Sequence, residues 1–305
     1  VTSIIGLIAF LFLFQNTYAQ KIVKLLSPDH HLVVNVYIQS HQLYYDINYR
    51  HQSVSKNTLA FQLGGKVYGN DIASIKVLHK EKISRSLELR GNHPIAKIDK
   101  QRYSMAVQSL NEGLNFSLMM NVYNNGVAVR YEVQHHNNQL EKDLSTIQFP
   151  EEVTYWWQGN VEEYEGTYSH SSIDEFKDSA TVGMPLTVSY ADHMYAAVME
   201  SNLHDFVGSY LMFEKEKKLF NYTLAGAVTP VTKKVMKSSW RIITVSNDLN
   251  GLVNNDIVSD VSANPDKLLF PDGIHSSWIK PGMAVWSWMS NKREVTPSNM
   301  RLFTD

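Results

Sequence analysis

Apolar and polar residues alternate with a period of two through most of this sequence. In residues 32–38 one side of an extended chain carries only aliphatic residues, Leu32, Val34, Val36 and Ile38. Such alternation is typical of a strand with one face in a core. Asn124-Asn125-Gly126 separates two alternating segments, and this turn sequence favours a β-hairpin. The pattern therefore predicts antiparallel β structure.

Further short strands are expected along the chain, at about 59–63, 72–79, 83–90, 102–109, 186–190, 194–200, 219–225 and 240–246. So many short strands in one stretch predict a mainly β fold, a large antiparallel two-sheet super-sandwich that occupies residues 20–265. Helical periodicity is scarce. We expect one helical turn at 172–177 and place Asp192 in a hairpin turn.

The beginning of the sequence has the pattern of a secretory signal peptide, residues 1–19. Its apolar run, 4–14, is too short to cross a bilayer, and Thr17-Tyr18-Ala19 has small residues at both positions that precede a cleavage site. We expect cleavage after Ala19, no membrane span afterwards, and a periplasmic or secreted bacterial protein. An uncleaved membrane anchor is the alternative.

Composition excludes several classes of function. The chain has no cysteine, so a secreted form depends on a large core or bound metal rather than on disulfides. Its formal net charge of −2 gives no support to nucleic-acid binding. No serine nucleophile elbow, glycine-rich phosphate loop or Cys/His metal motif is present. No catalytic residue is assigned.

The end of the sequence predicts the start of a second domain. We place a linker at 266–275 and a buried strand at 283–289, a nearly continuous apolar run. Thr296 would cap a helix that begins at Pro297. One βα unit cannot bury its own apolar faces, so residues 276–305 are predicted to be a truncated first βα unit.

Glu200 is the strongest single candidate for a functional residue. It shares a strand face with Ala196 and Val198, so its carboxylate points the same way as two core residues. A buried carboxylate needs a cation, an arginine or a backbone cap, which makes metal or substrate binding one interpretation. A glutamate that points into solvent is the other.

Two further segments have functional and structural interpretations. Trp156 and Trp157 are adjacent on a strand, so they face opposite sides and at most one can stack on a sugar ring; we assign substrate binding to Trp157. Packing in the core is the alternative. The acidic cluster Glu162, Glu163 and Glu165 has the oxygen ligands of a calcium site, or forms a solvated loop. Arg241 is expected to pair with an acid on another strand.

Several segments, in this order and spacing, resemble glycoside hydrolase family 97, the bacterial α-glucosidases and α-galactosidases. They are Ser27-Pro28-Asp29, Tyr123-Asn124-Asn125-Gly126-Val127-Ala128-Val129-Arg130-Tyr131, Tyr155-Trp156-Trp157, Met199-Glu200-Ser201-Asn202-Leu203-His204-Asp205-Phe206, Ser239-Trp240-Arg241 and Ser277-Trp278-Ile279-Lys280-Pro281-Gly282. The resemblance implies a β-super-sandwich, a (β/α)8 catalytic barrel and a small C-terminal β domain. This chain would cover the sandwich and the first barrel unit.

The resemblance also implies a metal cofactor and says which domain supplies which functional residues. The family glutamate that matches Glu200 binds an active-site calcium, and the catalytic acid and base or nucleophile lie in barrel segments beyond residue 305. One departure concerns Trp286-Ser287-Trp288, which continues into Met289 where relatives have further aromatics and a histidine. This departure puts substrate contacts at that strand end in doubt.

The leading hypothesis is the N-terminal portion of a secreted, calcium-dependent hydrolase of α-glucosides or α-galactosides. The partner would be an oligosaccharide substrate. A free-standing carbohydrate-binding or adhesion module of the cell envelope is the alternative, and an inactive hydrolase remnant is a third. A coding sequence that continues in frame past Asp305 would favour the enzyme, and an immediate stop would favour the module.

Overall fold

The computed structural model describes residues 22–89, 93–134, 139–204, 206–226, 234–280, 282–283 and 296–304. The predicted signal peptide, 1–19, lies outside these residues. The chain divides into two compact units, the first made of Val1–Leu87 and Ile95–Ala263, the second of Glu88–Pro94 and Asn264–Asp305. Each unit is described by itself.

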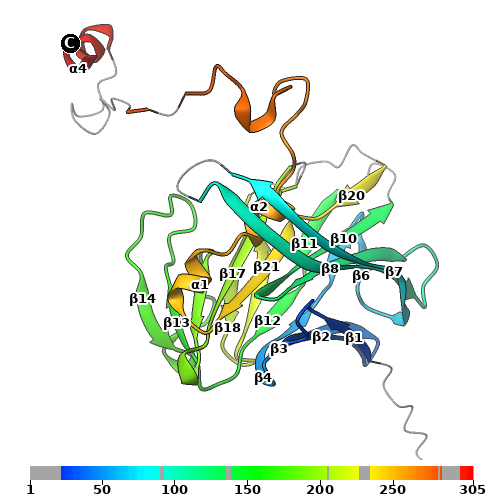
Figure 1. Cartoon of the computed structure of the whole chain (residues 1–305). Coiled ribbons are helices and arrows are strands. Elements are labelled where there is room, and N and C mark those ends of the chain that lie inside the picture. The colour runs from blue at the N-terminus through cyan, green and yellow to red at the C-terminus, as the bar shows by residue number, and fades with distance from the viewer. Residues whose placement is uncertain are drawn as a thin grey trace, which may run out of the picture. The chain divides into compact units, whose positions relative to one another are not determined.

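The first unit contains two large sheets in which every described strand pair is antiparallel (Figure 1). The first sheet has eight strands, in the order β1 (Val23–Leu26), β2 (Leu32–Gln39), β3 (Gln42–Tyr49), β4 (Gln52–Thr58), β12 (Thr146–Gln148), β19 (Leu219–Leu224), β18 (Ser209–Glu214) and β15 (Thr181–Val182). Half of this sheet is thus a run of sequential hairpins, and the other half is assembled from distant segments.

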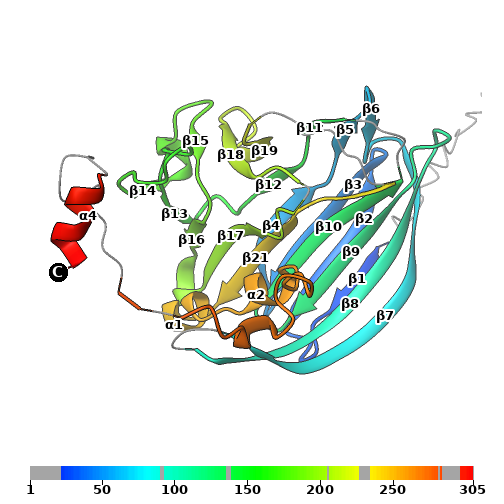
Figure 2. The ribbon, with the colours of Figure 1, turned by 90° about the horizontal axis from the view of Figure 1, so that it is seen from above.

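The second sheet has ten strands and carries the candidate site. Their order is β14 (Ser169–Ser172), β13 (Thr154–Trp157), β16 (Leu186–Ser189), β17 (Tyr195–Ser201), β21 (Trp240–Ser246), β10 (Gly126–Gln134), β9 (Phe116–Tyr123), β8 (Ile95–Ser109) and β7 (Ile72–Glu88), with β20 (Val235–Lys237) also paired to β10. A small third sheet joins β11 (Leu140–Asp143), β5 (Phe61–Leu63) and β6 (Lys66–Tyr68). In Figure 2 the long strands β7 and β8 curve along one edge of the second sheet.

Alternate residues of the two large sheets form one buried core, as the period-two pattern predicts. On β2 the side chains of Leu32, Val34 and Val36 are fully buried, and the same cluster includes Met105 and Val107 of β8. The predicted hairpin at 124–126 is confirmed, because β9 and β10 pair from Tyr123↔Gly126 onward. The large antiparallel sandwich is therefore observed.

Short helical segments connect the strands, and the single helical turn expected at 172–177 is confirmed as η1 (Ile173–Glu175). Asp192 lies in η2 (Ala191–His193), the turn between β16 and β17, as predicted. Two helices were not predicted, α1 (Leu249–Val253) and α2 (Ile257–Val261). Each has only five residues, too few for a helical period to show in the sequence.

One strand prediction was wrong in its division. Two strands were expected at 72–79 and 83–90, but the structure has the single strand β7. The charged residues Lys80-Glu81-Lys82, which separate the two expected ranges, lie within this one strand at the edge of the sheet. Charged side chains are tolerated there and discourage pairing with another chain.

The second unit contains η3 (Gly273–His275) and α4 (Pro297–Thr304). Helix α4 begins at Pro297 as predicted, and the backbone N–H of Asn299 donates to Oγ1 of Thr296 at 3.3 Å. The strand predicted at 283–289 lies outside the described residues apart from Met283, so the barrel start stays a prediction. In the described part of the chain, no helix is both long and apolar enough to cross a bilayer.

Candidate functional site

Glu200 lies near the end of β17, a strand in the interior of the second sheet. Ala196 and Val198, which share its strand face, are fully buried. Alternation then brings the Glu200 side chain toward the same interior, where it is half-buried. The sequence prediction of an inward-facing carboxylate at this strand end is thus confirmed.

Three hydrogen bonds hold the Glu200 carboxylate in place. The backbone N–H of Ser209 donates to Oε1 at 2.8 Å, and the Ser209 hydroxyl donates to Oε2 at 2.9 Å. The Ser239 hydroxyl donates a longer bond to Oε2 at 3.4 Å. Because Ser209 begins β18 of the first sheet, this carboxylate links the two sheets. A carboxylate has about four acceptor positions, so one position remains available on Oε1.

The surroundings of Glu200 disfavour its charge. Burial raises the pKa of the Glu200 carboxyl, against the hydrogen bonds from Ser209 and the positive charge of Arg241. Arg241 is the residue directly opposite on β21. A cation beside the carboxylate would relieve this cost, because an opposite charge favours the ionised form.

The described residues do not complete a calcium site. Among them, no group of three or more His, Cys, Asp or Glu side chains is placed to hold a metal ion. Calcium takes about six to eight oxygen ligands. Glu200 fits the role of one such ligand, and no described cluster of acidic or histidine side chains supplies the others.

Arg241 pairs with an acidic residue of another strand, as the sequence predicted. Its Nη2 donates to Asp143 of β11, and both side chains are almost completely buried. The guanidinium carbon also stands 4.5 Å from the centre of the Tyr222 ring. Arg241 is directly opposite Glu200 and contributes positive charge to its surroundings.

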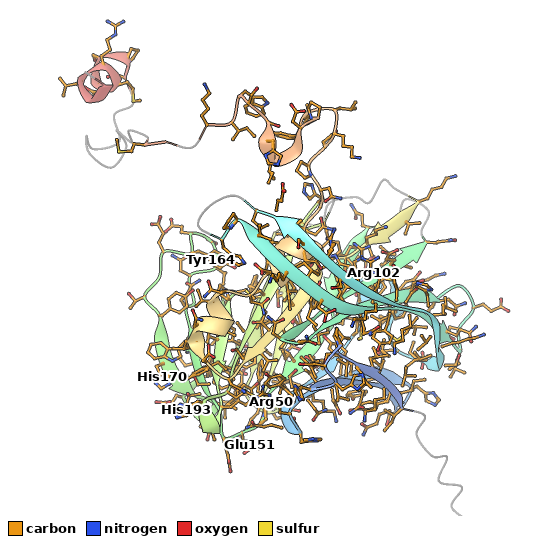
Figure 3. All side chains as sticks on the ribbon, viewed as in Figure 1. Arg50, Arg102, Glu151, Tyr164, His170 and His193 are labelled. Carbon is orange, nitrogen blue, oxygen red and sulfur yellow. The ribbon has the colours of Figure 1, made fainter. Side chains whose placement is uncertain are left out.

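Tyr164 and Gly208 flank the Glu200 carboxylate. Tyr164, labelled in Figure 3, is 45% exposed and is close enough for the Glu200 charge to raise its pKa in addition to the effect of burial. A Cβ atom added at Gly208 would lie 3.3 Å from Oε1 of Glu200. Glycine at position 208 therefore leaves space beside Oε1, the oxygen that retains an acceptor position.

The two tryptophans of β13 lie on opposite faces, as expected for neighbours on a strand. Trp157 is half-buried; it stacks on Phe176 with ring centres 4.7 Å apart, and its indole N–H donates to Ser171. Trp156 is 47% exposed and stacks on His170, which is labelled in Figure 3. Neither ring is next to Glu200 in any described contact, so the substrate role assigned to Trp157 stays a prediction.

The acidic cluster Glu162, Glu163 and Glu165 is exposed on the loop that follows β13. Sequence reasoning missed the residues that hold Glu200. Ser239 stands in one of the segments quoted for the family resemblance, but Ser209 has no local signal. It reaches Glu200 only because the two sheets pack together, and a linear pattern does not contain that information.

Comparison with known proteins gives a consistent result. The family model described as Glycosyl-hydrolase 97 N-terminal matches residues 25–264. A retaining alpha-galactosidase from Bacteroides thetaiotaomicron is 21% identical over 90% of this chain and 45% of its own length. The chain thus spans less than half the length of that curated relative.

Solved structures show the same fold. A glycoside hydrolase family 97 enzyme from Pseudoalteromonas sp. strain K8, in complex with acarbose, has a TM-score of 0.77 and 20% identity over 93% of this chain and 45% of its own. A β-arabinopyranosidase has a TM-score of 0.63 and 18% identity over 74% of this chain and 40% of its own. With the family model covering most of the sequence and the sandwich observed, the chain belongs to the glycosyl-hydrolase 97 N-terminal family.

Proposed function

We propose that this chain is the N-terminal β domain of a secreted, calcium-dependent glycosidase that acts on α-glucosides or α-galactosides. Membership of the family supports the glycosidase assignment. The α-galactosidase named among the relatives and the acarbose and panose complexes of the Pseudoalteromonas enzyme support the substrate class. The catalytic acid and the base or nucleophile would come from the part of the protein that corresponds to the rest of the relatives' length.

The Glu200 carboxylate is the observation that carries this proposal. It is half-buried, held from two sheets, and retains one acceptor position beside a glycine. A bound calcium would polarise the sugar or its leaving group. The chain's own contribution is to fix the direction of one oxygen ligand, which Ser209 does through two hydrogen bonds.

The first test replaces Glu200 with glutamine in the full-length protein. We expect at least a ~10-fold weaker calcium affinity by isothermal titration calorimetry, since one anionic ligand is lost. Glycosidase activity should fall with it, and the circular dichroism spectrum should not change. Glu214→Gln is the matched control, because Glu214 is another strand-end glutamate but bonds to Lys217 and Asn221. Equal calcium affinity in the wild type and Glu200→Gln would remove Glu200 from the site.

The second test assays these 305 residues alone on aryl α-glucosides and α-galactosides, with and without calcium. We expect no hydrolysis, because the proposal places the catalytic acid and the base or nucleophile in the part of the protein that corresponds to the rest of the relatives' length. Calcium-stimulated turnover would contradict the proposed division of labour. Secretion is checked by N-terminal sequencing of the mature protein, which should begin at Gln20; retention of residues 1–19 would overturn the predicted cleavage.

A further inference from the structure

A basic hollow lies on the outer face of the first sheet, remote from Glu200. Its volume is about 770 Å³, and its polar lining comes from Lys24, His30, His31, Asn35, Asn48, Arg50 and His51. We use the term basic hollow for this set. Figure 3 shows Arg50 beside β3 and β4, well separated in the view from Tyr164, which flanks Glu200. The hollow is therefore a different site from the one proposed for calcium.

Strand register places these residues together. Lys24 of β1 is opposite Asn35 of β2, and Asn48 of β3 is opposite Val33. The residues that alternate with them on these strands are buried in the core. Lys24, Asn35 and Asn48 therefore face outward. The turn between β3 and β4 adds Arg50 and His51, with φ of 49° and 69°. Such two-residue turns favour Asn-Gly, whereas this turn carries a cation and an imidazole.

The charge of the basic hollow is mostly uncompensated. No described carboxylate forms an ion pair with Lys24 or Arg50; Arg50 instead stands 5.3 Å from the centre of the Tyr49 ring. The imidazole of His31, which also lines the hollow, is 3.2 Å from the Asp29 carboxylate. The carboxylate of Asp46, on the same strand face as Asn48, accepts hydrogen bonds from Tyr37 and is directly opposite the cation of Lys56 on β4. Two fixed cations thus face a hollow whose nearby acids already have partners.

The chemistry of the lining selects the ligand. Arginine and lysine bind oxyanions through charge-assisted hydrogen bonds, and asparagine and histidine bond to hydroxyl groups. No tyrosine, tryptophan or phenylalanine belongs to the described lining, so a neutral pyranose would find no ring to stack on. The volume is in the range of sites for organic ligands and exceeds what a single inorganic anion fills.

We propose that the basic hollow binds a saccharide chain that carries oxyanions, such as sulfate or carboxylate groups. The oxyanion follows from the lining itself, whereas the saccharide carrier rests on the proposed function. In an enzyme of this class, the outer face of the β domain would then hold an acidic polysaccharide by a segment that is not cleaved. Binding of the saccharide to the basic hollow needs neither calcium nor Glu200. If no saccharide binds there, the proposed calcium-dependent activity is unaffected. If Glu200 proves not to bind calcium, the proposal for the basic hollow is likewise unaffected.

The experiment measures binding of dextran sulfate oligosaccharides to the full chain by calorimetry in calcium-free buffer. Unsulfated dextran of equal length and inorganic sulfate are the comparison ligands. The test variant is Lys24→Gln/Arg50→Gln. The control variant is Lys66→Gln/Lys142→Gln, which removes the same charge from exposed positions on β6 and β11. Circular dichroism verifies that both variants fold.

We expect dextran sulfate to bind the wild type. Its affinity should fall at least ~10-fold in the test variant, which removes the two cations that contact the ligand, and less than ~2-fold in the control variant. Unsulfated dextran should not bind. Equal losses in the two variants would show non-specific attraction to net charge and overturn the site. Inorganic sulfate that binds as tightly as dextran sulfate would overturn the saccharide carrier. Tight binding of unsulfated dextran would overturn recognition of the oxyanion.

Discussion

The buried pair of Asp143 and Arg241 allows a quantitative test of what holds the sandwich together. Asp143→Asn keeps the shape of the side chain but leaves the Arg241 cation without its counter-charge. Two unit charges about 4 Å apart attract by about 4 kcal/mol at the effective dielectric constant suited to proteins. Asparagine has one acceptor oxygen where the carboxylate uses two, so it can accept from the Ser145 N–H or from Arg241 but not from both in the same way. The one neutral hydrogen bond that it keeps returns about 1 kcal/mol. The net loss is therefore about 3 kcal/mol, in the range found for broken buried pairs.

The assay is urea unfolding followed by tryptophan fluorescence at neutral pH. Burial raises the pKa of Asp143 above its ordinary value and Arg241 opposes this rise, so neutral pH is chosen to favour the ionised carboxylate. With a slope of about 3 kcal/mol per molar urea, the midpoint should fall by about 1 M. The double variant Asp143→Leu/Arg241→Met removes both charges and should lie within about 1 kcal/mol of the wild type. A loss below about 1 kcal/mol in Asp143→Asn, or equal losses in both variants, would refute the reasoning.

Two further predictions concern acid stability and sugar binding. Although burial opposes it, hydrogen bonds from Lys100 and Tyr123 hold the pKa of Asp260 below its ordinary value of 3.8. The ionised Asp260 carboxylate therefore stabilises the folded state. This contribution is complete at a pH above 3.8, the ordinary pKa, and is lost as the pH falls through the lower pKa of the folded state. Asp260→Asn should thus cost about 3 kcal/mol at neutral pH and progressively less in acid; a pH-independent difference in unfolding free energy would contradict this. If Trp157 contacts substrate, Trp157→Phe should raise KM severalfold while Trp156→Phe does not; a lower Tm with unchanged KM would assign Trp157 to packing alone.

The sequence was sufficient for the fold class because the core of this protein is built from alternating strands. The positions of Leu32, Val34 and Val36 in the core follow directly from the period of two. The two short helices were missed because their stability comes from local capping and packing. Asp248 caps α1 by accepting a bond from the Gly251 N–H, and Ile257 of α2 is buried. Neither effect leaves a periodic pattern.

The candidate site was predictable only in part. The direction of the Glu200 side chain follows from strand alternation, and so does the expectation that Arg241 needs an acidic partner. The identity of that partner, Asp143, and the bonds from Ser209 depend on strands brought together from distant parts of the chain. The basic hollow was not foreseen for the same reason. Nothing in the local sequence distinguishes Lys24 or Arg50. Only the register of β1, β2 and β3 brings the two cations together in one hollow.

Register also explains why a costly ion pair stands next to the candidate ligand. Glu200 and Arg241 are directly opposite on β17 and β21, so they share one face of the sheet. A slip of β17 by one residue would turn Glu200 to the other face of the sheet and separate it from Ser209. Since Arg241 is buried where Asp143 meets it, a slip of β21 would leave a buried charge without its partner, so the pair disfavours other registers of β21. The pair therefore stabilises the strand against which β17 is paired. The double variant that removes the pair is expected to preserve stability while loosening the bonds from Ser209 to Glu200.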